Sequence, residues 1–240
     1  MAADLARRSG RTEWMDTEEI GATEFEACLR DLARVNALTL AYRPTLSWFA
    51  RAVERRDPGR ALHVLDVGCG YGDMLRRLLL WSRERGIDLD CVGIDLNPWA
   101  KPAAQAATPP GWPIRYRTAD IFAYKPDRPV DIIISSLFTH HLTDEELIKF
   151  LRWMDAQAGV GWFINDLHRH WLPYHSVRLA FPLLRFHRMV VHDGPISVAR
   201  GFTPADWDRL LQAAGLRRPD VQVERFFPFR FGVGCLRQGR

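Results

Sequence analysis

The 240-residue sequence lacks the features of a disulfide-linked, secreted or membrane-spanning protein. No two cysteines have the CxxC spacing, so neither a disulfide framework nor a zinc site is predicted. The four are Cys28, Cys69, Cys91 and Cys235. No run approaches the roughly 18 uninterrupted apolar residues of a spanning helix, and the charged N-terminal segment has no apolar core like that of a signal peptide. We therefore expect a cytoplasmic protein without a membrane span.

The remaining composition is that of an ordinary globular protein, with 47% hydrophobic and 26% charged residues. The chain is long enough for one α/β domain with an appendage. The net charge of +4 is unevenly distributed: residues 1–166 have 21 basic against 24 acidic side chains, and residues 167–240 have 12 against 5. A basic C-terminal third can attract nucleic acid, anionic lipid or an acidic substrate, and a solvated arginine-rich surface is the simpler alternative.

The most informative stretch is residues 64–75, VLDVGCGYGDML. An apolar run leads into alternating glycines and then into helical spacing, which predicts a strand, a tight loop and a helix. Glycine is required where the backbone adopts a positive φ or approaches a ligand closely. The glycines at 68, 70 and 72 form GxGxG, whereas dinucleotide sites usually have GxGxxG. A structural glycine turn and a nicotinamide or flavin site are the alternatives.

Two further predicted strands also end in an acid. Residues 89–95 end at Asp95, 23 residues after Gly72, where doubly wound folds place an acceptor for ribose hydroxyls. Residues 112–122 contain the sequence Ala-Asp-Ile, with Asp120 at the strand end. Asp95 can alternatively cap the following helix. Because ligands of open α/β sheets bind at the carboxyl ends of the strands, these acids and Asp66 predict one ligand site.

The motif VLDVGCGYG resembles the first motif of class I S-adenosylmethionine-dependent methyltransferases, and the sequences at Asp95 and Asp120 resemble the second and third. The resemblance covers residues 60–166 well and residues 201–237 fairly well. It extends to small-molecule enzymes of the ubiquinone/menaquinone type or type 11/12 domains. It implies S-adenosylmethionine as cofactor. The cofactor contacts that it implies are Asp66, Gly68, Cys69, Gly70, Gly72, Asp95, Leu96, Asp120, Ile121, Ser135 and Leu137.

We predict an α/β fold: a Rossmann-like, seven-stranded, mainly parallel sheet with an antiparallel C-terminal strand pair. Residues 1–59 are expected to form an N-terminal helical cap, with residues 1–20 frayed or loosely docked and a helix from Thr23 to about Tyr42. Residues 60–240 are expected to form the methyltransferase domain. A lid is inserted at residues 167–200, helical over 172–186 and loop-like over 187–195. The later elements are a helix that begins after Thr143, a helix over 204–214, and strands over 221–227 and 229–236.

Histidines follow the fourth and fifth predicted strands, residues 130–138 and 161–167, where the methyl group is expected to project. A histidine with a pKa near 7 suits removal of a hydroxyl proton. The candidate catalytic residues are His140, His141, Asp166, His168 and His170. Packing against the cofactor is the alternative for the first two. Asp166, His168 and His170 alternate along an extended segment and can form half of a metal site, although no metal is expected.

The sequence therefore predicts methyl transfer to a small apolar or aromatic acceptor, such as a phenolic, quinone-like or polyketide compound of secondary metabolism, more readily on oxygen. Aromatic and apolar residues of the cap and lid favour such an acceptor. They are Trp48, Phe49, Trp171, Tyr174, Phe181, Leu183, Leu184 and Phe186. An RNA methyltransferase and a non-catalytic regulatory module are the alternatives. No RNA-binding module or NPPY-like sequence supports a nucleic-acid partner, and the oligomeric state stays open.

Overall fold

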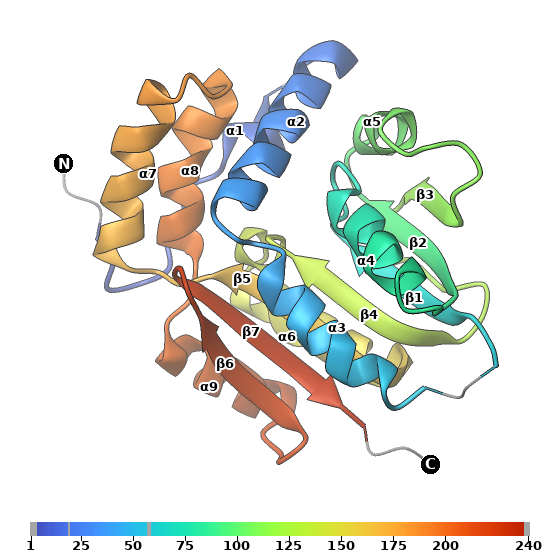
Figure 1. Cartoon of the computed structure of the whole chain (residues 1–240). Coiled ribbons are helices and arrows are strands. Elements are labelled where there is room, and N and C mark those ends of the chain that lie inside the picture. Colours follow the sequence, from blue (N-terminus) through green and yellow to red (C-terminus); the bar gives the residue numbers. More distant parts are fainter. Residues whose placement is uncertain (1–3, 19, 57–58, 238–240) are drawn as a thin grey trace.

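The computed structural model describes residues 4–18, 20–56 and 59–237. Within these residues, seven strands form a sheet of order β3-β2-β1-β4-β5-β7-β6 (Figure 1). The strands are β1 Leu62–Val67, β2 Leu89–Asp95, β3 Ile114–Thr118, β4 Val130–Ser136, β5 Ala158–Leu167, β6 Val221–Phe226 and β7 Arg230–Leu236. Strands β1 to β5 are parallel, and β7 pairs antiparallel with β5 and β6. The predicted fold class is confirmed.

The carboxyl ends of the central strands meet at one edge of the sheet. Val67 at the end of β1 pairs with Ile94 of β2 on one side and with Ser135 of β4 on the other. The β-branched run of β4 is buried because helices cover both faces of the sheet. The loops that follow these strands therefore leave the sheet side by side.

Alternate residues of the strands pack into two layers of helices. Helices α3 Arg43–Val53, α4 Asp73–Arg83 and α5 Ala100–Ala106 lie on the face to which Val64 and Ile134 point. Helices α6 Asp144–Gln157 and α9 Pro204–Ala214 cover the opposite face, where Leu65 and Ile133 lie. This alternation follows from the two-residue period of a strand. Helix α3, which was expected in the cap of residues 1–59, lies in the same layer as α4 of the domain expected over residues 60–240. The boundary between the two stays a prediction.

Four further helices gather beyond the carboxyl edge of the sheet (Figure 1). They are α1 Trp14–Thr17, α2 Ala22–Leu38, α7 Trp171–Leu183 and α8 Arg188–Arg200. Cys28 of α2, Phe181 of α7 and Met189 of α8 share one apolar cluster, against which Trp14 of α1 packs. The N-terminal segment and the insertion after β5 thus form one helical layer.

Helix boundaries follow the capping residues where these are present. Thr143 and Glu146 form the expected capping box at the start of α6. Thr203 caps α9, Pro204 is its first residue, and Gly215 adopts a left-handed φ of 75° just beyond its end.

The expected loop over residues 187–195 is wrong, because Arg188–Arg200 is helix α8 and contains Gly194 and Pro195. The Gly-Pro pair predicted a break, but burial of Met189 and Ile196 outweighs this local preference. A Cβ on Gly194 would lie 2.6 Å from the Phe181 ring, so glycine lets α7 and α8 approach closely. A smaller correction concerns α2, which ends at Leu38 rather than near Tyr42. Leu40, just beyond its end, has a φ of 55°.

The expectation that residues 1–20 are frayed is also wrong for the described part of this segment. Arg8 pairs with Asp144 at 2.6 Å and lies over the ring of Phe202. The backbone N–H of Ser9 donates to the Ala199 carbonyl at 3.0 Å. Glu13 is only 2% exposed. Charge along the segment predicted solvation, whereas these side chains find partners in α6, α8 and the loop after β4.

Candidate active site

The glycine loop between β1 and α4 has the conformation that its sequence predicts. Gly68 and Gly72 adopt φ values of 71° and 70°, and Gly72 is the N-cap of α4. A Cβ on Gly68 would lie 2.7 Å from the Phe138 side chain, and one on Gly72 would meet the Tyr116 ring. Positive φ and close approach together exclude other residues here. Cys69 between them is buried.

Asp95 lies directly against this loop. Its Oδ2 accepts from the Gly70 backbone N–H and its Oδ1 accepts from the Asn97 N–H, both at 2.9 Å. Burial raises the pKa of the Asp95 carboxyl, which these hydrogen bonds partly offset. The adjacent Leu96 is 70% exposed although it is apolar. The end of β2 therefore offers an anchored carboxylate beside an uncovered apolar surface.

Asp66 and Asp120 flank Asp95 at the ends of β1 and β3. Asp66 is buried, and among the described residues its Oδ1 has no hydrogen-bond partner. Burial, together with the charges of Asp73 and Asp95, raises the pKa of Asp66 well above its usual value. Asp120 is exposed and accepts from the Phe122 N–H at 2.9 Å, next to buried Ile121. Asp66 thus has an unpartnered oxygen that a cationic ligand group can satisfy.

Ser135 and Leu137, at the end of β4, have roles in the fold itself. The Ser135 hydroxyl donates to the Val67 carbonyl at 2.9 Å and so joins β4 to β1. Leu137 adopts a φ of 57°, and its N–H donates to the Asn165 carbonyl. This left-handed residue turns the chain into the short helix η1 Thr139–His141.

Asp166 is fully buried at the end of β5 and holds the η1 turn. Its Oδ1 lies 2.7 Å from Nδ1 of His140, and its Oδ2 accepts from the Thr139 hydroxyl at 2.5 Å and the His140 N–H at 3.1 Å. Burial opposes ionisation of Asp166, but the charge of His140 and these hydrogen bonds outweigh it and lower the pKa of Asp166 below its usual range. The ionised carboxylate accepts a hydrogen bond from Nδ1–H of His140, so Nε2 is the ring nitrogen that points away from Asp166 and toward Glu13.

His141 is held in a similar way by the N-terminal segment. Its Nδ1 lies 3.0 Å from Oδ2 of Asp16, and its Nε2 lies 3.8 Å from Oε2 of Glu13. Burial would lower the pKa of His141, but the hydrogen bond that its Nδ1–H donates to Asp16 and the charge of Glu13 raise it to about 9. His141 is therefore protonated near neutral pH. Its charge also acts on Asp95, which places this group beside the end of β2.

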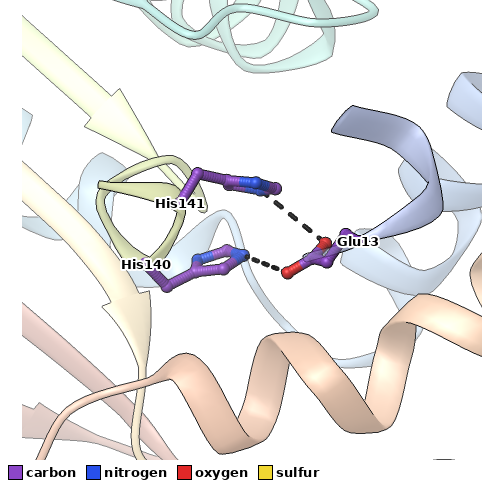
Figure 2. Close-up of side chains that lie close together, drawn as sticks. All are labelled: Glu13, His140 and His141. Carbon is purple, nitrogen blue, oxygen red and sulfur yellow. Dashed lines mark ion pairs between the residues drawn. The ribbon is translucent and has the colours of Figure 1, made fainter. Parts of the chain in front are cut away.

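The Glu13 carboxylate faces both imidazoles (Figure 2). Nε2 of His140 lies 3.7 Å from Glu13 Oε1, and Oε1 has no hydrogen-bond partner among the described residues. The ligand atoms of Glu13, His140 and His141 lie within 4.8 Å of one another, close enough for a divalent cation. Protonated His141 and the Arg200 guanidinium, whose Nε lies 3.9 Å from Oε1, already balance the Glu13 charge without a metal.

His168 and His170 belong to a different group. The His168 ring packs edge-on against Phe231 with centroids 4.9 Å apart, and the His170 ring stacks on Phe229 at 5.1 Å. His170 also accepts from the Leu172 N–H and so caps α7. Burial lowers the pKa of His168. In the described part of the chain neither ring bonds to Asp166, and Asp166, His168 and His170 do not form a group that could hold a metal ion, which was the less favoured alternative for them.

The glycine loop and the strands around it match a known protein family. Residues 64–158 match the family model described as a methyltransferase domain. Over these residues the chain is similar to a methyltransferase domain. No curated protein sequence matches this chain.

Solved structures with the same fold cover nearly the whole methyltransferase. The plantazolicin methyltransferase BpumL in complex with SAH is 15% identical, with 90% of this chain and 96% of that chain covered and a TM-score of 0.63. Human N-acetylserotonin methyltransferase in complex with SAM is 19% identical, with coverages of 92% and 57% and a TM-score of 0.61. Magnesium protoporphyrin IX methyltransferase from Synechocystis PCC 6803 with bound SAH is 15% identical, with coverages of 83% and 82% and a TM-score of 0.53.

Several residues of the methyltransferase site lie outside the sequence predictions. Glu13 and Asp16 come from a segment whose charges predicted a frayed end, and no motif marks them. Arg200, the last residue of α8, donates to the His140 and His141 carbonyls at 2.9 and 2.6 Å.

The apolar residues expected around the acceptor divide between the core and the outer surface. Trp48 and Phe49 of α3 pack against the sheet face that contains Val64 and Ile134. Phe181 and Phe186 pack among the helices beyond the carboxyl edge. Trp171, Leu183 and Leu184 are exposed.

Proposed function

We propose that this methyltransferase binds S-adenosylmethionine at the carboxyl ends of β1 to β4 and transfers its methyl group to an oxygen of a small apolar or aromatic acceptor. Solved structures of the same fold carry SAM or SAH. The acceptors of those proteins say nothing about the acceptor of this chain. We infer an oxygen acceptor from the histidine cluster next to the expected cofactor site.

The residues present fit this cofactor. The unpartnered Oδ1 of Asp66 can accept from the ammonium of the methionine part, and the backbone of the Gly68–Gly72 loop allows close approach. Asp95 is held by Gly70 and Asn97 in a position to accept from ribose hydroxyls, and exposed Leu96 offers an apolar face to the adenine. Each cofactor contact expected from the sequence stays a prediction.

When bound, S-adenosylmethionine supplies a methyl group that is already activated by a positively charged sulfur. The protein has to align the acceptor oxygen in line with the S–CH₃ bond and remove the hydroxyl proton. The O–C bond forms as the S–C bond breaks, and the proton passes to a base of the chain.

We assign the base to Nε2 of His140. Asp166 holds the imidazole in the tautomer that leaves this nitrogen free, as the carboxylate of a catalytic triad does. Glu13 Oε1 faces it at 3.7 Å, and an acceptor hydroxyl that enters here can hydrogen-bond to both groups. Protonated His141 adds positive charge that favours the developing oxyanion.

The 2.7 Å contact between His140 and Asp166 carries this assignment, and substitution of His140 tests it. With a panel of phenols and radiolabelled S-adenosylmethionine, His140→Ala should lower kcat by about two to four orders of magnitude, the range of general-base catalysis. His175→Ala is a matched control because His175 is exposed on α7. Binding of S-adenosylhomocysteine should be similar in both variants.

Two further variants test the other candidate bases. His168→Ala and His170→Ala should retain most of the activity, because these rings pack on Phe231 and Phe229. If His140→Ala keeps its turnover and His168→Ala or His170→Ala loses it, the base belongs to the pair His168 and His170 instead. Unchanged turnover in all three variants would exclude His140, His168 and His170 as the base.

A further inference from the structure

The outer side of α7 is apolar and uncovered. Leu179 and Leu183, one helical turn apart, are 67% and 81% exposed. Figure 1 shows α7 at the outside of the helical layer, with α8 on its inner side. We define the α7 surface as Trp171, Leu172, Leu179, Leu183 and Leu184 together with Phe227.

Phe227 joins this surface from the turn between β6 and β7. It is 80% exposed. His170 connects the two parts, because its ring stacks on Phe229 and lies 5.7 Å from the Trp171 ring. Phe227 lies two residues before Phe229 in the same turn, so the turn brings a further exposed apolar side chain to the end of the strand pair beside the start of α7. Exposed apolar patches of this kind mark interaction sites on soluble proteins.

The charged side chains of residues 171–186, which form α7 and the turn after it, are all basic. Residues 167–192 contain four arginines and five histidines but no aspartate or glutamate, and two of these arginines are paired elsewhere, Arg169 with Asp206 and Arg188 with Glu18 and Glu24. Arg178 lies on α7 and Arg185 just beyond its end, both exposed, and neither forms an ion pair within the part of the chain that the structure describes. A second copy of the chain docked symmetrically on this surface would bring these arginines together without carboxylates to pair with them.

We propose that the α7 surface binds the anionic face of a lipid bilayer, with α7 lying in the plane of the interface. The leucines and Trp171 would enter the boundary between headgroups and acyl chains, and Arg178 and Arg185 would contact lipid phosphates. No helix among the described residues is long and apolar enough to cross a membrane. Apolar burial with electrostatic attraction is the usual basis of such interfacial binding.

This surface is directly connected to the candidate active site. β5 ends at Leu167, next to Asp166, and α7 begins four residues later at Trp171. If the proposed function holds, an amphipathic acceptor dissolved in the bilayer can reach the site along this helix. The bilayer contact itself does not depend on the methyl transfer, so the two proposals can fail separately.

Flotation of the full chain with vesicles tests the proposal. The protein should float with vesicles of phosphatidylcholine and phosphatidylglycerol, and much less with pure phosphatidylcholine. Leu179→Gln/Leu183→Gln should weaken binding about tenfold through lost apolar insertion. Arg178→Gln/Arg185→Gln should weaken it about thirtyfold at low salt and remove most of its salt dependence. Leu80→Gln is the matched control, because Leu80 is an exposed leucine on α4.

Circular dichroism and thermal unfolding of each variant separate loss of binding from loss of folding. Absence of flotation for the wild type, or equal flotation of the folded wild type and both double variants, would overturn the proposal. Light scattering provides the remaining outcome. A concentration-dependent dimer that Leu179→Gln/Leu183→Gln dissociates would assign the surface to a second copy of the chain instead.

Discussion

Nδ1 of His140 lies 2.7 Å from Oδ1 of Asp166, although His140 follows β4, Asp166 lies near the end of β5, and the two residues are 26 positions apart. The contact exists because β4 and β5 are parallel neighbours whose carboxyl ends meet at one edge. The tight turn after β4, with Leu137 at a φ of 57°, directs His140 back over the end of β5. The pair is therefore a product of sheet topology.

Asp166→Asn should damage catalysis more than folding. An amide cannot accept from both His140 and Thr139 as the carboxylate does, so the preferred tautomer of His140 is lost. We expect kcat to fall about a hundredfold and the free energy of unfolding to fall by about 1–3 kcal/mol. Steady-state kinetics and chemical denaturation measure the two effects. A wild-type kcat in this variant would exclude Asp166 as the positioning residue.

The N-terminal segment should loosen at alkaline pH. The pKa of His141 is about 9 in the folded protein against 6.5 for a free histidine. A raised folded pKa means that the protonated form stabilises the fold. This contribution is complete below the free value and disappears as the pH rises through the folded value.

The free energy of unfolding of the wild type should therefore exceed that of His141→Gln most near pH 6.5 and least above the folded pKa of about 9. Denaturation curves of the two proteins across this range give the difference directly. Asp16→Asn should reduce the same pH dependence, because Asp16 holds Nδ1 of His141. A constant difference across the range would contradict the assigned pKa.

Chelation of divalent cations should leave methyl transfer unchanged. Glu13, His140 and His141 have the spacing of a metal site, but Arg200 and protonated His141 already neutralise the carboxylate. Turnover measured after dialysis against EDTA should equal that of the untreated enzyme. Loss of activity that zinc alone restores would instead make these three side chains metal ligands.

Sequence patterns predicted the strands of the sheet well, because a strand or a turn depends mainly on the residues that form it. The buried β-branched run of β4, the GxGxG loop and the capping box at Thr143 each report the conformation of their own residues. The partners of the histidines depend on which distant segments pack together. Glu13 lies in a charged segment that resembles a solvated terminus, and the docking of Arg8, Ser9 and Trp14 on distant segments brings it next to His140 and His141.

The same distinction explains helix α8 and the separation of Asp166 from His168 and His170. Gly194 and Pro195 oppose helix locally, but Gly194 allows contact with Phe181, which no pattern within α8 reveals. Asp166 alternates with the two later histidines in sequence. Its carboxylate nevertheless bonds to the η1 turn, while their rings find Phe229 and Phe231.

Gly68→Ala should impair cofactor binding and folding together, and Gly86 offers a control for backbone strain. Both glycines have a left-handed φ, 71° at Gly68 and 64° at Gly86. A Cβ at position 86 meets nothing within 4 Å, whereas at position 68 it would lie 2.7 Å from Phe138. Gly86→Ala should therefore cost only the strain of a positive φ, about 1 kcal/mol of unfolding free energy. Gly68→Ala should cost about 1–3 kcal/mol more, because Phe138 has to move.

Since Phe138 follows the end of β4 directly, this movement should also weaken the binding of S-adenosylhomocysteine, which calorimetry measures. Gly86→Ala should leave this affinity unchanged. Equal affinities in the two variants would show that the Gly68 loop does not contact the cofactor.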